Sequence, residues 1–349
     1  MTPVLEQRDH PEGRQRQLYS FLRRFVQARS DREPAVLLFD DIQWIDQASD
    51  GYLTQLVEAT SGTRTLLLAN FRPEYHAEWM GKSDYQQLPL SPLGPEAIDD
   101  LLHELLGDDR TVAGLRDLIR GRTGGNPFFI EEVVQSLAES ESLSGTRGAY
   151  RLETPMEELA IPDTVHAVLA ARIDRLPERE KQVLQTAAVA SAMGRRFSES
   201  LLARVAGLPA PDLTAALSRL HADEFLVEEA LYPELEYGFK HPLTQEVAYD
   251  TQLSDRRAEV HAALARALEE IYADKLDEQA ALIAYHWEQA GEALAAARWH
   301  RRAAQWAART DLDQALRHWR SVRALAGAGP ESSDSLGLAQ RACIAILQV

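Results

Sequence analysis

The sequence contains 349 residues, of which 45% are hydrophobic and 26% are charged, a composition typical of globular proteins. At roughly 150 residues per domain, this length predicts two or three domains. The formal net charge of −17 argues against binding to nucleic acid or anionic membranes through charge alone. Cys343 is the single cysteine, which excludes an intramolecular disulfide and a cysteine-based zinc site. No apolar run has the length of a membrane helix or a signal sequence, so we expect a cytoplasmic protein without a membrane partner.

Apolar runs near the N-terminus predict an α/β domain over residues 1–93. A polar start is followed by an apolar helical stripe, formed by Leu18, Phe21, Leu22, Phe25 and Val26. The continuous apolar runs 35–39 and 65–69 predict parallel strands buried on both faces, with a helix after Asp46 between them. A third, weaker strand is predicted near Gln87–Leu90. Strand, helix and strand in this order favour a parallel sheet.

Helical periodicity dominates from Pro95 onward. Apolar stripes on both sides of the break at Gly124-Gly125-Asn126-Pro127 predict a helical subdomain, a lid, over 94–138. The next segment, 139–158, is rich in Ser, Glu, Gly and Thr and predicts a linker.

Two further domains are predicted in the second half of the chain. Residues 159–255 hold four helical stretches and a hairpin around Pro233, which favours a winged-helix unit; the expected helices cover 163–175, 178–190, 198–207 and 211–222. Residues 256–349 are alanine-rich helices that break near Gly291 and Thr310, which favours an incomplete tetratricopeptide-like repeat. Its tryptophans are expected in the core or in a groove that binds a protein partner.

The segment 36–46 carries the sharpest chemical signal and reads Val-Leu-Leu-Phe-Asp-Asp-Ile-Gln-Trp-Ile-Asp. Asp40 and Asp41 follow a predicted parallel strand directly, at the sheet edge where α/β proteins bind ligands. One carboxylate there can hold Mg²⁺, and a second can polarise the water that attacks a γ-phosphate. The alternative is a solvated loop or helix cap after a core strand.

This segment resembles the Walker B segment of STAND-class P-loop ATPases, in particular the modules attached to class III adenylate cyclases and large LuxR-type regulators. The resemblance continues in chain order, through Leu-Leu-Leu-Ala-Asn-Phe-Arg-Pro-Glu at 66–74, Gly-Gly-Asn-Pro-Phe-Phe at 124–129 and Phe-Lys-His-Pro-Leu at 239–243. It implies an α/β fold, a partial P-loop ATPase sheet, followed by mainly α structure: the lid, the winged helix and the repeat. ATP or ADP with Mg²⁺ would be the ligand.

The resemblance also implies roles for individual residues. Asp40 would hold Mg²⁺, Asp41 would position or activate the attacking water, and Arg72 would sense the γ-phosphate. Pro127, in the turn with Asn126, would lie against adenine, and His241 would contact the β-phosphate of ADP. The open alternatives are a surface arginine for Arg72, a helix stop and restart for the turn, and a histidine packed at the hairpin exit for His241.

The sequence departs from the family pattern in one respect. A P-loop reads Gly-x4-Gly-Lys-Ser/Thr, and the single Gly-Lys-Ser, at 81–83, has His76 in place of the first glycine. We interpret this Gly-Lys-Ser as a chance match. We expect the chain to be a family member that lacks the first strand, the P-loop and the first helix of the ATPase domain. Since P-loop amides and lysine supply most of the phosphate grip, we expect weak or no ATP binding and negligible hydrolysis.

Two functions follow as hypotheses. The first is a truncated ATP-binding regulatory module in which nucleotide state controls an effector or protein partner through the C-terminal helices. The second is a non-catalytic scaffold with a degenerate nucleotide site. DNA binding is disfavoured, because 222–239 carries six acidic residues and no lysine or arginine.

Overall fold

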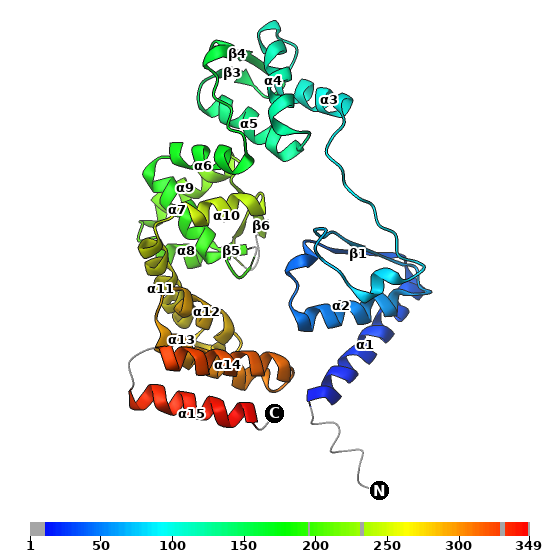
Figure 1. Cartoon of the computed structure of the whole chain (residues 1–349), viewed down its shortest axis with the longest axis vertical. Coiled ribbons are helices and arrows are strands. Elements are labelled where there is room, and N and C mark those ends of the chain that lie inside the picture. The colour runs from blue at the N-terminus through cyan, green and yellow to red at the C-terminus, as the bar shows by residue number, and fades with distance from the viewer. Residues whose placement is uncertain (1–10, 195, 231–233, 329–331, 348–349) are drawn as a thin grey trace. The chain divides into compact units, whose positions relative to one another are not determined.

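The computed structural model describes residues 11–194, 196–230, 234–328 and 332–347. Helices dominate this part of the chain, together with three small sheets (Figure 1). The chain divides into two compact units. One comprises 1–88, 274–288 and 292–349, and the other comprises 89–273 and 289–291. The predicted polar start and Pro233 lie outside the described residues.

The α/β segment of the first unit is built around two parallel strands. In chain order it contains α1 (Pro11–Arg32), β1 (Ala35–Phe39), the short 3-10 helix η2 (Ile42–Trp44), α2 (Gln47–Thr60), β2 (Thr65–Ala69) and the 3-10 helix η3 (Glu78–Gly81). The strands pair in register from Ala35 with Thr65 to Phe39 with Ala69, which confirms the predicted parallel pair. Alternate side chains such as Leu37 and Leu67 pack into a core with residues of α1 and α2.

Two predictions about this segment are wrong. The strands are buried on one face only, and the other face exposes Val36, Leu38, Leu66 and Leu68 by 44–70%. The core that both helices share lies on the opposite face, so one apolar face of the pair stays open to water. The predicted strand at Gln87–Leu90 is extended chain with exposed leucines, because Pro89 has no N–H to donate to a sheet.

The second unit begins with a helical subdomain. It contains α3 (Pro95–Leu106), the 3-10 helix η4 (Arg110–Val112), α4 (Ala113–Thr123), α5 (Pro127–Glu139), the strands β3 (Leu143–Thr146) and β4 (Ala149–Leu152), and the 3-10 helix η5 (Met156–Glu158). The prediction of a linker over 139–158 is therefore wrong. Its polar residues form the antiparallel hairpin β3–β4, while Leu143, Tyr150 and Leu152 attach that hairpin to the helical core.

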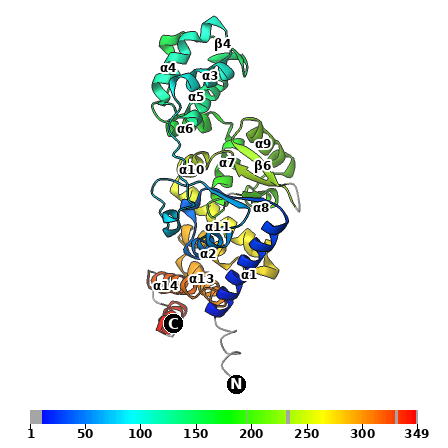
Figure 2. The same cartoon turned by 90° about the vertical axis from the view of Figure 1, so that its right-hand side faces the viewer.

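A second group of helices packs with a three-stranded antiparallel sheet of order β5-β7-β6. Figure 2 labels β6 beside α7, α8 and α9. Its elements are α6 (Val165–Arg175), α7 (Glu178–Ala190), β5 (Arg196–Ser198), α8 (Glu199–Val205), α9 (Ala210–Ala222), β6 (Leu226–Ala230), β7 (Glu236–Phe239), α10 (Pro242–Asp250) and α11 (Ser254–Ile271). The four predicted helices and the hairpin strands are present within a few residues of their expected bounds, and β5 was not predicted. Their shared core includes Leu184, Leu217 and Phe225, all almost fully buried.

The remaining residues are helical. They form the 3-10 helix η6 (Ala273–Lys275), α12 (Ala280–Gln289), α13 (Ala293–Ala307), α14 (Leu312–Ala328) and α15 (Ser333–Leu347). Small residues such as Ala297 and Ala342 allow α13, α14 and α15 to pack closely around Val322. None of the described helices combines the length and apolar character needed to cross a bilayer.

Candidate functional site

The first candidate group lies at the carboxyl ends of β1 and β2. Since Phe39 pairs with Ala69 in parallel register, the next residues, Asp40 and Asn70, leave the sheet side by side. The Asn70 amide donates a hydrogen bond from Nδ2 to Asp40 Oδ1. Its Oδ1 accepts one from the backbone N–H of Asp41 at 2.6 Å. Asn70 therefore holds the two consecutive acidic residues at one edge of the sheet.

The backbone turns sharply at Asp41. This residue has φ 56° and ψ 44°, in the left-handed region that non-glycine residues seldom adopt. The hydrogen bond to Asn70 compensates part of the cost of this conformation. The turn directs the chain into η2, and Gln43 Nε2 donates to Asp41 Oδ1 at 3.1 Å.

Arg72 joins the same group through Gln43 and Trp44. The Arg72 backbone N–H donates to Gln43 Oε1 at 3.2 Å, and the Arg72 guanidinium carbon lies 5.7 Å from the centroid of the Trp44 ring. Both Arg72 and Trp44 are exposed. The predicted group of Asp40, Asp41 and Arg72 is thus brought together on an open surface, with a delocalised cation beside two acidic residues.

The loop after β2 is anchored by aromatic side chains. The Tyr75 hydroxyl donates to Asp50 Oδ1 of α2 at 2.5 Å, and its ring packs against Phe71 and Trp79. Burial, and then the hydrogen bond to Asp50, raise the pKa of Tyr75 far above its ordinary value. Because Tyr75 N–H also donates to the Arg72 carbonyl, this anchor fixes the backbone that carries Arg72.

The second candidate group belongs to the other unit and surrounds the N-terminus of α5. Asn126 caps this helix by accepting the Phe129 N–H, and Pro127 occupies its first turn. The Phe128 ring stacks on the His241 ring with centroids 3.8 Å apart and planes 14° apart. Asn126, Pro127 and His241, three residues predicted from the sequence, are thus neighbours through Phe128.

His241 also has a structural role. It is the N-cap of α10, and its Nδ1 accepts the Leu243 N–H at 3.1 Å. A neutral imidazole in this arrangement carries its proton on Nε2. The capping bond and the stack on Phe128 agree with the alternative of a histidine packed at the hairpin exit.

The donor set of the first group fits a magnesium ion only in part. Asp40 and Asp41 offer carboxylate oxygens, which Mg²⁺ prefers, but one oxygen of each already accepts a side-chain hydrogen bond. Within the described residues, no group of three or more His, Cys, Asp or Glu side chains is arranged to hold a metal ion. The pair suits an ion whose other ligands are water and phosphate.

Sequence reasoning missed Asn70 and Gln43 as members of this group. Two strands of equal length were predicted, and parallel strands of equal length end at the same edge, so the pairing of Asp40 with Asn70 could have been expected. Gln43 carried no such signal, because its contact with Arg72 depends on the turn at Asp41.

Comparisons with known proteins identify a family model, a curated relative and solved structures. Residues 94–144, which cover α3 to α5 and the start of β3, match a family described as Domain of unknown function (DUF8739). A curated relative, Uncharacterized protein R02095 from Rhizobium meliloti (strain 1021), is 28% identical over 294 residues. That alignment covers 82% of this chain and 27% of the relative, so the chain spans a minor part of the relative's length.

A solved structure is similar at low identity. It is the Signal Transduction ATPase with Numerous Domains (STAND) protein with a tetratricopeptide repeat sensor, PH0952, from Pyrococcus horikoshii. The sequence identity is 11% and the TM-score is 0.48, over 93% of this chain and 45% of that one.

Proposed function

We propose that this chain is part of a regulatory ATP-binding module of the STAND type, in which nucleotide state controls a partner or effector. Asp40 would hold Mg²⁺, Asp41 would position or activate a water near the γ-phosphate, and Arg72 would sense the γ-phosphate. In the second unit, taken by itself, Pro127 in the turn with Asn126 would lie against an adenine ring, and His241 would contact the β-phosphate of ADP. The helices α12 to α15 present the surface for the partner.

One observation carries this proposal. Asn70 joins Asp40 and Asp41 at the carboxyl end of a parallel strand pair, with Arg72 tied to the same turn through Gln43. The hydrogen bond from the Asp41 N–H to Asn70 fixes the left-handed turn at Asp41 against the neighbouring strand. Carboxylates held in this way beside a guanidinium are suited to a hydrated cation and to anionic phosphate oxygens.

The proposal includes weak binding. The printed sequence contains no P-loop, and two carboxylates repel a triphosphate unless Mg²⁺ lies between them. We therefore expect a dissociation constant for Mg-ATP weaker than micromolar and no significant hydrolysis. A micromolar or tighter complex would contradict this account of the phosphate grip.

Saturation-transfer NMR suits weak ligands and tests the proposal. Protein resonances are saturated and the adenine protons of ATP are observed, with and without Mg²⁺. We expect a Mg²⁺-dependent signal that Asp40→Ala abolishes and that a control variant, Asp84→Ala at an exposed loop position, retains. The absence of an adenine signal from the unmodified protein at millimolar ATP would overturn the proposal.

The second function, a scaffold without nucleotide, is favoured by the open geometry of the first group. Asp40, Asn70 and Arg72 are all exposed, and a carboxylate oxygen of Asp40 is already bound by Asn70. A scaffold would bind its protein partner equally well with and without Mg-ATP, whereas a regulatory module would not.

A further inference from the structure

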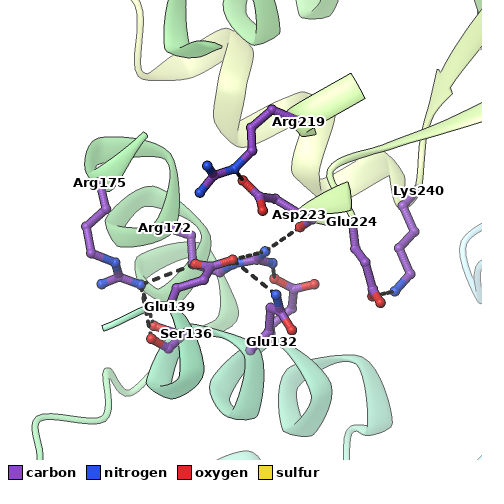
Figure 3. Close-up of polar contacts among 10 residues, drawn as sticks. Glu132, Ser136, Glu139, Arg172, Arg175, Arg219, Asp223, Glu224 and Lys240 are labelled. Atoms are coloured by element: carbon purple, nitrogen blue, oxygen red, sulfur yellow. Dashed lines mark hydrogen bonds and ion pairs between the residues drawn. The ribbon is translucent and has the colours of Figure 1, made fainter. Parts of the chain in front are cut away.

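A buried charge cluster in the second unit has no part in the proposed nucleotide chemistry. Arg172 on α6 is 1% exposed and is the bulkiest fully buried side chain among the described residues. Its guanidinium donates to Glu132 and to both oxygens of Glu139 on α5, the latter at 2.5–3.0 Å (Figure 3). It also donates to the Asp223 carbonyl at 2.8 Å and lies 4.4 Å from the centroid of the Phe225 ring.

The cluster around Arg172 is balanced in charge. Four basic and four acidic side chains form it, namely Arg172, Arg175, Arg219 and Lys240 with Glu132, Glu139, Asp223 and Glu224. Burial raises the pKa of Glu132 above its ordinary value, against the charge of Arg172, which lowers it. Only Arg172 and Glu132 are buried, whereas Arg175, Arg219, Lys240 and Glu224 are 34–60% exposed. Burying an ion pair such as Arg172–Glu132 adds little net stability compared with apolar packing, so the benefit is expected in the geometry it enforces.

Three separate elements meet at the guanidinium. The carboxylates come from α5, the arginine from α6, and the accepting carbonyl of Asp223 from the turn between α9 and β6. A lysine could not replace this planar group, because its single ammonium cannot match several acceptors in fixed directions. The arginine therefore sets both the position of α5 on α6 and the position of α5 relative to the sheet.

A closed ring of contacts connects Arg172 with His241. Glu224, which follows the Asp223 carbonyl, pairs with Lys240, the residue before His241. The Lys240 N–H also donates to the Phe225 carbonyl at 3.1 Å. On α5, Phe128 and Glu132 are four residues apart and so share one helical face. The Phe128–His241 stack at the start of α5 and the Glu132–Arg172 ion pair one turn later close the ring of contacts.

From this arrangement we propose that Arg172 is a positioning residue that keeps the N-terminus of α5, with Asn126 and Phe128, against His241. The functional consequence, which is that Asn126, Pro127 and His241 are held in place for a nucleotide, rests on the proposed function. The placement of the His241 ring itself needs no nucleotide.

The test reads the His241 ring directly. In the full chain carrying ¹³C-labelled histidine, the stacked Phe128 ring shifts the His241 ring protons upfield, and His241→Gln assigns the signal. We expect Phe128→Leu and Arg172→Lys both to move these protons downfield, toward the position of an unstacked histidine. Arg175→Met is the matched control, since Arg175 lies on the same helix and pairs with Glu139 at 3.6 Å but is partly exposed. It should leave the signal in place.

Two further variants separate positioning from stability. Arg172→Met leaves buried carboxylates without their cation and is expected to unfold the subdomain. The triple variant Arg172→Met, Glu132→Gln, Glu139→Gln removes both signs of charge and should fold with a displaced His241 signal. If Arg172→Lys and the triple variant both fold and the His241 signal is unchanged in them, the proposal is overturned. If both variants unfold, Arg172 is a purely stabilising residue, and the proposal is overturned as well.

Nucleotide provides a separate readout. If the adenine saturation-transfer signal exists in the unmodified protein, Arg172→Lys should weaken it while Arg175→Met should not. A displaced His241 signal together with no adenine signal in any variant would refute the proposed function and retain the positioning role. An unchanged His241 signal in Arg172→Lys, together with normal adenine binding, would refute the positioning role and retain the proposed function.

Discussion

Acidification should destabilise the second unit through one buried histidine. His261 on α11 is 0% exposed, and its Nε2 lies 3.0 Å from the Tyr249 hydroxyl. Burial, and then the positive charge of Arg257, lower the pKa of His261 to about 4 from its ordinary 6.5. Between these two values the unfolded chain binds a proton that the folded chain refuses. Stability is therefore present above the unfolded pKa and is lost as pH falls from 6.5 toward 4.

The magnitude follows from the size of the shift. A difference of about 2.5 pKa units at 1.36 kcal/mol per unit gives a limit of about 3 kcal/mol, of which about 2 kcal/mol is lost by about pH 5. His261→Gln keeps a polar group near Tyr249 but does not titrate. This variant should lose about 2 kcal/mol less than the unmodified protein between about pH 8 and about pH 5.

Hydrogen exchange measured by mass spectrometry is the appropriate assay. All six tryptophans lie outside 89–273, so tryptophan fluorescence would not report this unit. The protection of α11 amides, corrected for the intrinsic pH dependence of exchange, gives the local opening free energy directly. Tyr249→Phe is the control, since it retains His261 and should retain the acid sensitivity. Equal losses in the unmodified protein and His261→Gln would refute the reasoning.

Three further substitutions test the local geometry. Asn70→Asp replaces an amide donor with a third carboxylate and should destabilise the α/β segment by about 1–3 kcal/mol. Denaturant unfolding followed by the fluorescence of Trp44 and buried Trp79, with the four tryptophans of 287–319 replaced by phenylalanine, measures this change, and an unchanged midpoint would contradict the Asn70 bridge. Gly125→Ala places a Cβ 2.6 Å from the Leu93 carbonyl oxygen at φ +81° and should lower the melting temperature. Gly124→Ala, with no atom within 4 Å of its Cβ, should lower it less. Leu38→Ala on the open sheet face should change stability by less than about 0.5 kcal/mol, while Leu37→Ala on the covered face should cost about 2 kcal/mol in the same unfolding assay.

Local sequence predicted the regular elements of this chain well. The strands 35–39 and 65–69 and the helix 178–190 have the predicted bounds, because apolar runs and apolar periodicity act within a few residues. The hairpin β3–β4 was missed because the segment 139–158 as a whole is rich in Ser, Glu, Gly and Thr. It is held by tertiary contacts of Leu143, Tyr150 and Leu152, which composition does not reveal.

The candidate site was predictable where backbone geometry alone brings residues together. Asp40, Asp41 and Arg72 follow strands of one parallel pair, so their proximity required no knowledge of side chains. The contact of Gln43 with Arg72 depends on the turn at Asp41, so strand pairing does not predict it. The Phe128–His241 stack joins residues more than a hundred positions apart, across two subdomains that Arg172 connects. No local pattern in the sequence predicts such long-range contacts, and the family resemblance implied roles for Pro127 and His241 but not this stack.

The open face of the β1–β2 pair shows why a correct strand prediction can accompany a wrong burial prediction. Val36, Leu38, Leu66 and Leu68 are side chains that favour burial, and the sequence places them in unbroken apolar runs. An apolar run indicates that its side chains could be buried. Whether a face of the sheet is buried depends on whether other helices or strands pack against that face. Both α1 and α2 contribute to the core on the other face, so these four leucine and valine side chains meet water. Because these side chains are exposed, they contribute little hydrophobic free energy to folding. Replacing Leu38 should therefore change the free energy of unfolding only slightly, and this substitution is the most direct test that one face of the strand pair is open.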